Sequence, residues 1–121
     1  MKAILEDLNQ RLGARGSLVV TRDGLPVCAV LGTATPNDRL DRLAAMGAAI
    51  LSDVRRSLAA AGLDEFTQCE VAAEQGKVVL VAAGPTYLVV LVGPRIEIGP
   101  GSVEIRSAAR QIEKAAVLAT A

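Results

Sequence analysis

The sequence of 121 residues contains no histidine, and this absence removes whole classes of chemistry. Without an imidazole the chain offers no Ser-His or Cys-His nucleophile and no histidine ligand for a metal. Cys28 and Cys69 are the only thiols, too few for a tetrahedral zinc site in one chain or for a disulfide framework. We therefore expect neither a metal nor a cofactor.

Aromatic side chains and net charge are also scarce. Tryptophan is missing, and Phe66 and Tyr87 are the only aromatic residues, so stacking platforms for bases or sugars are not expected. Thirteen basic residues balance thirteen acidic ones, which leaves no basic footprint for nucleic acid. A net charge of zero does little to oppose self-association.

Long apolar runs are absent as well. The longest, at residues 78–83 and 87–92, fall far short of the ~20 residues that a membrane span needs. Acidic residues interrupt the apolar pattern of the first twelve positions, unlike in a signal peptide. With 51% hydrophobic and 21% charged residues, we expect one packed domain over residues 1–121, located in the cytoplasm.

Apolar residues at helical spacing predict three helices. The first ends at Gly13, and a long second helix covers residues 38–61, with Asn37 or Asp38 as its N-cap and Gly62 as its stop. After a loop, Ser102 is expected to cap the third helix.

The remaining segments predict five strands. Asp23-Gly24 between two β-branched runs predicts a hairpin, and Pro26 indicates that its second strand lies at a sheet edge or begins late. Three more strands are expected at residues 67–74, 78–83 and 87–92. The first of them alternates in polarity, whereas the other two are apolar throughout, as is typical of strands covered on both faces.

The predicted fold class is therefore α+β, with element order α-ββ-α-βββ-α. One five-stranded, mainly antiparallel sheet would lie between the long helix on one face and the two terminal helices on the other, in three α/β/α layers.

Four segments, by their order and spacing, resemble the roadblock/dynein light chain family, with its MglB-like proteins. They are the hairpin Val-Val-Thr-Arg-Asp-Gly-Leu-Pro-Val at residues 19–27, the small-residue helix at 43–49, the paired strands at 77–92 and the closing loop and helix at 99–114. The resemblance implies a roadblock fold with strand order 2-1-5-4-3 and a homodimer through the third strand and the long helix.

The third strand supports a homodimer independently, because an open sheet edge needs protection and a symmetry mate would extend the sheet. Beside the core stripe of the long helix, a strip of mostly small residues would let a partner helix approach closely. The alternative is that alanine is simply a good helix former. The expected dimer interface comprises Ala44, Ala48, Ser52, Arg55 and Ala59 on the helix and Cys69, Glu70, Val71 and Ala72 on the strand.

By resemblance, the homodimer is a non-enzymatic regulator of a Ras-like small GTPase of the MglA or Rag kind, acting on its hydrolysis or localisation. The chain has no P-loop pattern, so the nucleotide would belong to the partner. An arginine could serve as a finger, but relatives are thought to reposition the GTPase's own residues. The expected GTPase-binding residues are Arg39, Arg42, Ala45, Met46, Ala49, Asp53 and Arg56.

Other interpretations stay open. An ordinary solvated helix face would carry the same arginines, and a structural adaptor of a motor or cell-polarity complex would not change GTP turnover. The run at residues 99–102 could bind a phosphate but favours a turn with an N-cap. Glu70 and Glu74 form a conceivable acid pair without an aromatic platform.

Overall fold

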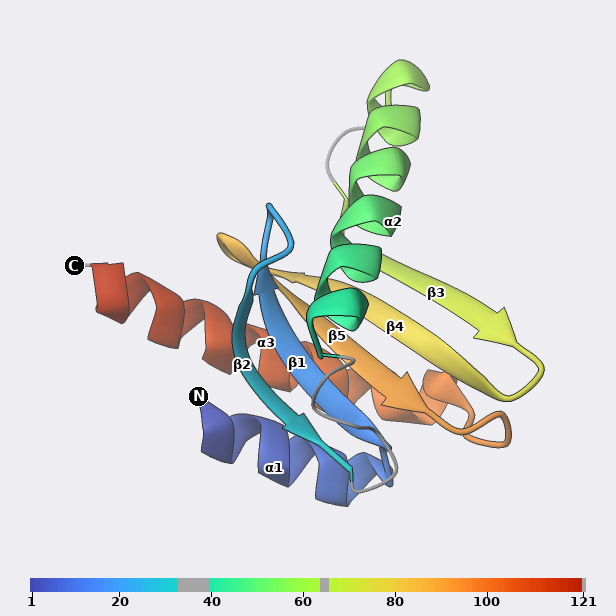
Figure 1. Cartoon of the computed structure of the whole chain (residues 1–121), viewed down its shortest axis with the longest axis vertical. Helices are drawn as coiled ribbons and strands as arrows, with labels where there is room; N and C mark the ends of the chain where they lie inside the picture. Colours follow the sequence, from blue (N-terminus) through green and yellow to red (C-terminus); the bar gives the residue numbers. More distant parts are fainter. Residues whose placement is uncertain (33–39, 64–65, 121) are drawn as a thin grey trace.

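The computed structural model describes residues 1–32, 40–63 and 66–120, and its elements follow the predicted order (Figure 1). They are α1 (Lys2–Leu12), β1 (Gly16–Thr21), β2 (Pro26–Leu31), α2 (Leu40–Ala60), β3 (Gln68–Ala73), β4 (Gly76–Ala83), β5 (Thr86–Val92) and α3 (Ile98–Thr120). The expected N-cap of α2, Asn37 or Asp38, lies outside the described residues.

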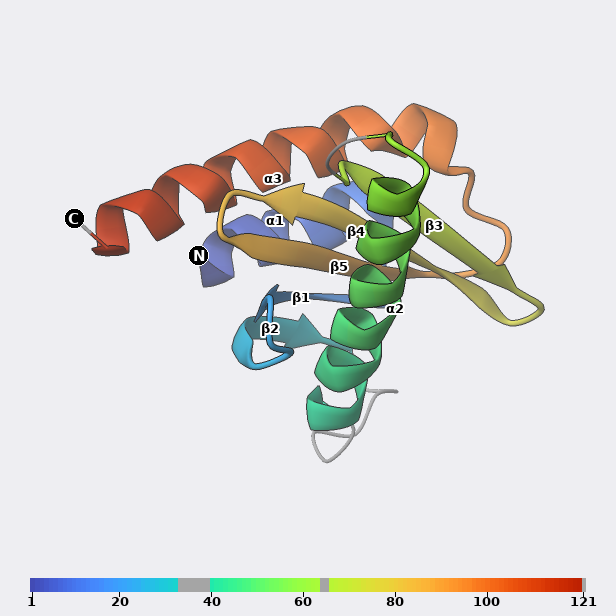
Figure 2. The same ribbon diagram turned by 90° about the horizontal axis from the view of Figure 1, so that it is seen from above.

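The strands form one antiparallel sheet in the order β2-β1-β5-β4-β3. The apolar β5 is central, and Pro26 lies in an edge strand, as predicted. Figure 2 shows α1 and α3 on one face of the sheet and α2 on the other. The three-layer α+β fold is thus confirmed.

Two hydrophobic cores lie on the two faces of the sheet. Val19 and Val90 of the central strands pack with α1 and α3, whereas Leu18 and Val89 pack with α2. Because adjacent strand residues point to opposite faces, a strand buried on both sides must be apolar at every position. This explains the continuous apolar runs in the sequence.

The hairpin and the helix ends follow the sequence signals closely. Gly13 and Gly62 have φ of 66° and 71° directly after α1 and α2, the left-handed conformation that ends many helices. In the hairpin turn Gly24 has φ of 87°. Glycine adopts these angles without the steric cost that a Cβ would bring.

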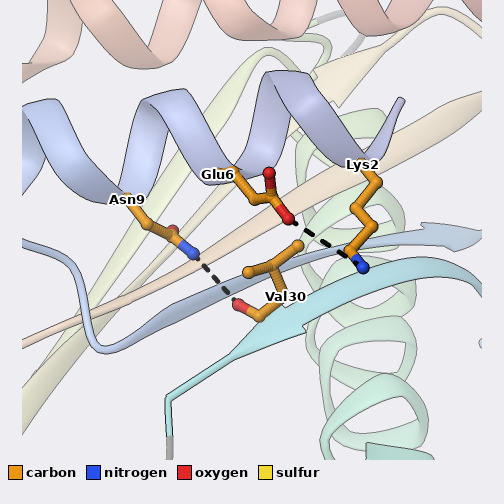
Figure 3. A network of polar contacts seen from close by, with 4 residues as sticks. All are labelled: Lys2, Glu6, Asn9 and Val30. Carbon is orange, nitrogen blue, oxygen red and sulfur yellow. Dashed lines mark hydrogen bonds and ion pairs between the residues drawn. The ribbon is translucent and has the colours of Figure 1, made fainter.

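Polar contacts fix α1 on the sheet (Figure 3). The Nδ2 of Asn9 donates a hydrogen bond of 3.0 Å to the carbonyl of Val30 in β2. On the exposed side of the same helix, Lys2 and Glu6 form an ion pair of 3.9 Å. The half-buried hydrogen bond ties α1 to the edge strand, whereas exposed i,i+4 pairs contribute little stability.

The last helix begins at Ile98, so the prediction of an N-cap at Ser102 is wrong. Pro100 suggested a loop, but in the first turn of a helix proline loses no hydrogen bond, because these N–H groups have no partner within the helix. Residues 99–102 therefore belong to the helix and do not form the separate turn that the sequence favoured.

Candidate protein-interaction site

The outward face of α2 carries the predicted GTPase-binding residues. At ~100° per residue they fall on one stripe, opposite the residues that face the sheet. Six of them are exposed: Arg42, Ala45, Met46, Ala49, Asp53 and Arg56. Arg39 lies outside the described residues. The structure thus brings these six together on a single surface, which we call the α2 outer stripe.

Close packing on the inner side of α2 sets the orientation of the stripe. A Cβ placed on Gly47 would lie 3.5 Å from a methyl of Val89 and 3.6 Å from one of Leu80, so the helix backbone is near the sheet at this point. Leu51, one turn further on, is buried in the same core. With this side against the sheet, the outer stripe must face away from it.

The arginines of the outer stripe have no ion-pair partner among the residues that the structure describes. Among the described residues, neither Arg42 nor Arg56 forms an ion pair; the pairs present there are Lys2–Glu6, Asp7–Arg11 and Glu70–Lys77. The two guanidinium groups flank an apolar centre at Met46, whose exposed fraction is 40%. Such a surface can make both hydrophobic and charged contacts with a partner.

Two residues of the helical part of the predicted dimer interface have neighbours within the chain. Ala44 is fully buried in the α2 core, so its side chain is not available to a partner. Ala48 faces the β1–β2 hairpin, since a Cβ on Gly24 would lie only 2.9 Å from its Cβ. The small residues make room for this hairpin within the chain, at the opposite end of the sheet from β3.

The other helix residues of the predicted interface are exposed, but they lie on the same flank of α2 as Ala48. Ser52, Arg55 and Ala59 follow Ala48 on the hairpin-facing flank at ~100° per residue. The three side chains are open to a partner, and their part in a dimer stays a prediction.

The strand part of the predicted interface is open. Cys69 is half-buried against the α2 core, whereas Glu70, Val71 and Ala72 are exposed. The backbone N–H of Ala82 donates to the Thr67 carbonyl at 3.1 Å, which sets the phase of the β3–β4 ladder. Because antiparallel bonding alternates, the backbone groups of Glu70 and Ala72 point outward, toward the free edge.

Larger apolar residues occupy the other flank of α2, and they were not among the residues predicted for an interface. Ile50, Val54 and Leu58 are half-buried and pack with the same cluster as Cys69 and Val78. Their recurrence every four residues was visible in the sequence, but it indicated only a core stripe. Because they are only half-buried, they are candidates for contact with a second chain.

Other chemistry finds no support in the described residues. Cys28 packs on the α1/α3 side of the sheet and Cys69 on the α2 side, so the two free thiols are not neighbours. Glu70 lies 3.9 Å from Lys77, in an ion pair. Over the described chain, three or more potential metal ligands are nowhere grouped, and no helix combines the length and apolarity that crossing a membrane demands.

Comparisons with known proteins agree with this architecture. Residues 2–92 match the family model described as Roadblock/LC7 domain. An uncharacterized protein of Methanocaldococcus jannaschii, MJ0714, is 31% identical over 91% of this chain and 91% of its own length. The crystal structure of a Roadblock/LC7 domain from Streptomyces avermitilis superposes with a TM-score of 0.88 at 18% identity, covering 97% and 98% of the two chains. Myxococcus xanthus MglB gives 0.85 at 19% identity, covering 93% and 91%.

Proposed function

The chain belongs to the Roadblock/LC7 domain family, and on this premise we propose that it is a non-enzymatic, cytoplasmic regulator that binds a Ras-like small GTPase. The observation that carries the proposal is the α2 outer stripe, where Arg42 and Arg56 flank exposed Met46 without ion pairs among the described residues. The resemblance implies docking on this side of the long helix.

The proposal includes a homodimer joined through β3. Two β3 edges related by a two-fold axis would satisfy the outward backbone groups of Glu70 and Ala72 and extend the sheet across both chains. On α2 we propose Ile50 and Val54 for the contact, because both are half-buried and pack in the cluster that also holds Cys69 of β3. The two outer stripes would then lie on the same face of the dimer.

Binding at the outer stripe is tested with charge reversals and a matched control. We expect the double variant Arg42→Glu/Arg56→Glu to bind a Ras-like GTPase of the same organism at least about tenfold more weakly in calorimetric titration, because reversed charges meet the same partner surface. The control, Arg106→Glu/Arg110→Glu, changes the same charges on α3, on the other face of the sheet. Equal affinity of the first variant and the parent chain would refute this surface.

A second candidate function is a structural adaptor, which the same stripe would serve equally well. GTP hydrolysis by the bound GTPase, measured with and without this chain, separates the two. If the parent chain changes the hydrolysis rate and the Arg42→Glu/Arg56→Glu variant, added in its place, does not, the result supports a regulator. An unchanged rate at saturating binding indicates an adaptor.

A further inference from the structure

A groove of about 270 Å³ lies between α1 and α3, on the face of the sheet opposite α2. Figure 2 shows the two helices together on this face. Leu8 and Ala108 form its buried apolar part, and Ile4 is half-buried beside them. The proposed GTPase surface does not include this groove.

One carboxylate in the groove, that of Glu104, has no partner among the residues that the structure describes. The Oε2 of Glu104 is shielded from water and accepts no hydrogen bond, and no ion pair of Glu104 is present within the described part of the chain. A desolvated oxygen that carries part of a negative charge is costly when nothing compensates it. Since the charge is shared by both oxygens, a cation near either one would relieve the cost.

The other charges of the groove do not supply this cation. Arg11 also lines the groove, but its Nε contacts Asp7 at 2.9 Å, so this pair is neutral as a unit. Glu104 therefore leaves the groove with a net negative charge, which disfavours an anionic ligand. A divalent metal ion would require more oxygen ligands than one free carboxylate offers.

One residue that lines the groove, Val103, is apolar and exposed. Val103, adjacent to Glu104 in the sequence, has an exposed fraction of 70%, the highest among the large apolar residues of the described chain. A side chain with an aliphatic stem and a cationic head could cover the methyl groups of Val103 and reach the Glu104 carboxylate at the same time. Arginine and lysine have this construction.

From the unpartnered Glu104 beside exposed Val103, we propose that the α1–α3 groove binds an arginine or lysine side chain of a partner polypeptide, with an apolar neighbour of that residue resting on Val103. This interaction is separate from the GTPase proposal, because it uses the opposite face of the sheet. Either proposal can fail without the other.

The probe is a blocked dipeptide, acetyl-Leu-Arg-amide, titrated into the full chain and followed by amide chemical shifts. We expect shifts confined to residues 4–11 and 103–111, with weak affinity in the millimolar range that suits a single side chain. The matched probe contains citrulline, which has nearly the shape of arginine without the charge. It should bind at least about tenfold more weakly, because the charge-assisted contact is lost.

The variant Glu104→Gln should lower the affinity for the arginine probe at least about tenfold, since the amide keeps the shape but not the charge. Glu113→Gln, on the same helix but outside this groove, should leave the affinity unchanged. In the free chain, Glu104→Gln should not lower the midpoint of thermal unfolding, whereas a carboxylate with only a structural role would lower it.

Three results would overturn the proposal. They are the absence of shifts at the groove up to about 10 mM probe, equal binding of the arginine and citrulline probes, and binding that survives Glu104→Gln. The comparison of probes uses the unaltered chain, so the proposal remains testable even if the variant does not fold.

Discussion

Two glycines that share a backbone conformation differ in what surrounds them. Gly24 and Gly62 both have left-handed φ values, 87° and 71°. A Cβ on Gly62 would meet nothing within 4 Å, but on Gly24 it would lie 2.9 Å from the Cβ of Ala48. Of these two glycines, Gly24 is the one whose missing side chain serves tertiary packing as well as the turn.

This pair yields the first prediction. Gly62→Ala should lower the free energy of unfolding by about 1 kcal/mol, the cost of a left-handed backbone for an L-residue. Gly24→Ala should cost roughly 1–3 kcal/mol more, because the hairpin and α2 must move apart. Denaturant titration of both variants measures the difference, and equal losses would contradict the packing argument.

A second prediction concerns two buried hydroxyls. Thr86 donates a hydrogen bond of 2.9 Å to the Ala83 carbonyl, so Thr86→Val should lower the free energy of unfolding by about 1 kcal/mol. Ser17 is fully buried, and its Oγ has no partner among the described residues. Ser17→Ala should therefore leave stability unchanged or raise it by up to about 1 kcal/mol, since a desolvated hydroxyl is removed. A clear loss for Ser17→Ala in the same assay would show that its hydroxyl is bonded in solution.

At the scale of elements, the edge strand β3 provides a test of dimer formation. The outward N–H of Ala72 takes no part in the β3–β4 ladder, so Ala72→Pro should leave the subunit folded and remove one donor from the shared edge. We expect sedimentation of this variant as a monomer under conditions where the parent chain is a dimer.

The control for this prediction is the neighbouring residue. The backbone of Val71 faces β4, so Val71→Pro breaks the ladder within the subunit and should lower the free energy of unfolding. Ala72→Pro should lower it by no more than about 1 kcal/mol. If Ala72→Pro stays dimeric and folded, the interface does not use β3.

The features that could be predicted from the sequence are those that depend on interactions between residues close together in the chain. The hairpin at Gly24, the stops at Gly13 and Gly62 and the central apolar β5 were predictable because local chemistry or strand periodicity determines them. The start of α3 was not, because Pro100 is compatible with both a loop and a first helical turn.

The predicted dimer strip on α2 shows a different limit. Periodicity places Ala48 beside the core stripe, but it does not show whether the neighbour is a partner chain or a turn of the same chain. The neighbour proves to be Gly24. The exposed outer stripe was predictable because a helix that packs on a sheet has only one outward side. The shielding of the Glu104 Oε2 was not predictable, because it depends on how α1 and α3 pack together.

At the scale of the whole molecule, the fold extends beyond the part that matches the family model. The match ends at residue 92, yet α3 contributes Ile105, Ala108 and Ile112 to the core that also holds Leu5 and Leu8 of α1. A helix that completes one of the two cores found among the described residues belongs to the cooperative unit.

A chain ending after Glu97 should therefore not fold cooperatively. Burying an isoleucine side chain contributes about 1.5–3 kcal/mol, so the loss of several core residues approaches the whole stability of a small domain, about 5–15 kcal/mol. We expect the truncated chain to show no sigmoidal denaturant transition and to bind a hydrophobic dye. As a control, the full-length variant Ile105→Val should lose only about 1 kcal/mol and keep its transition. A truncated chain with the full-length midpoint would show that the sheet, α1 and α2 are stable alone, and α3 would then be free to leave the sheet and expose the α1–α3 face.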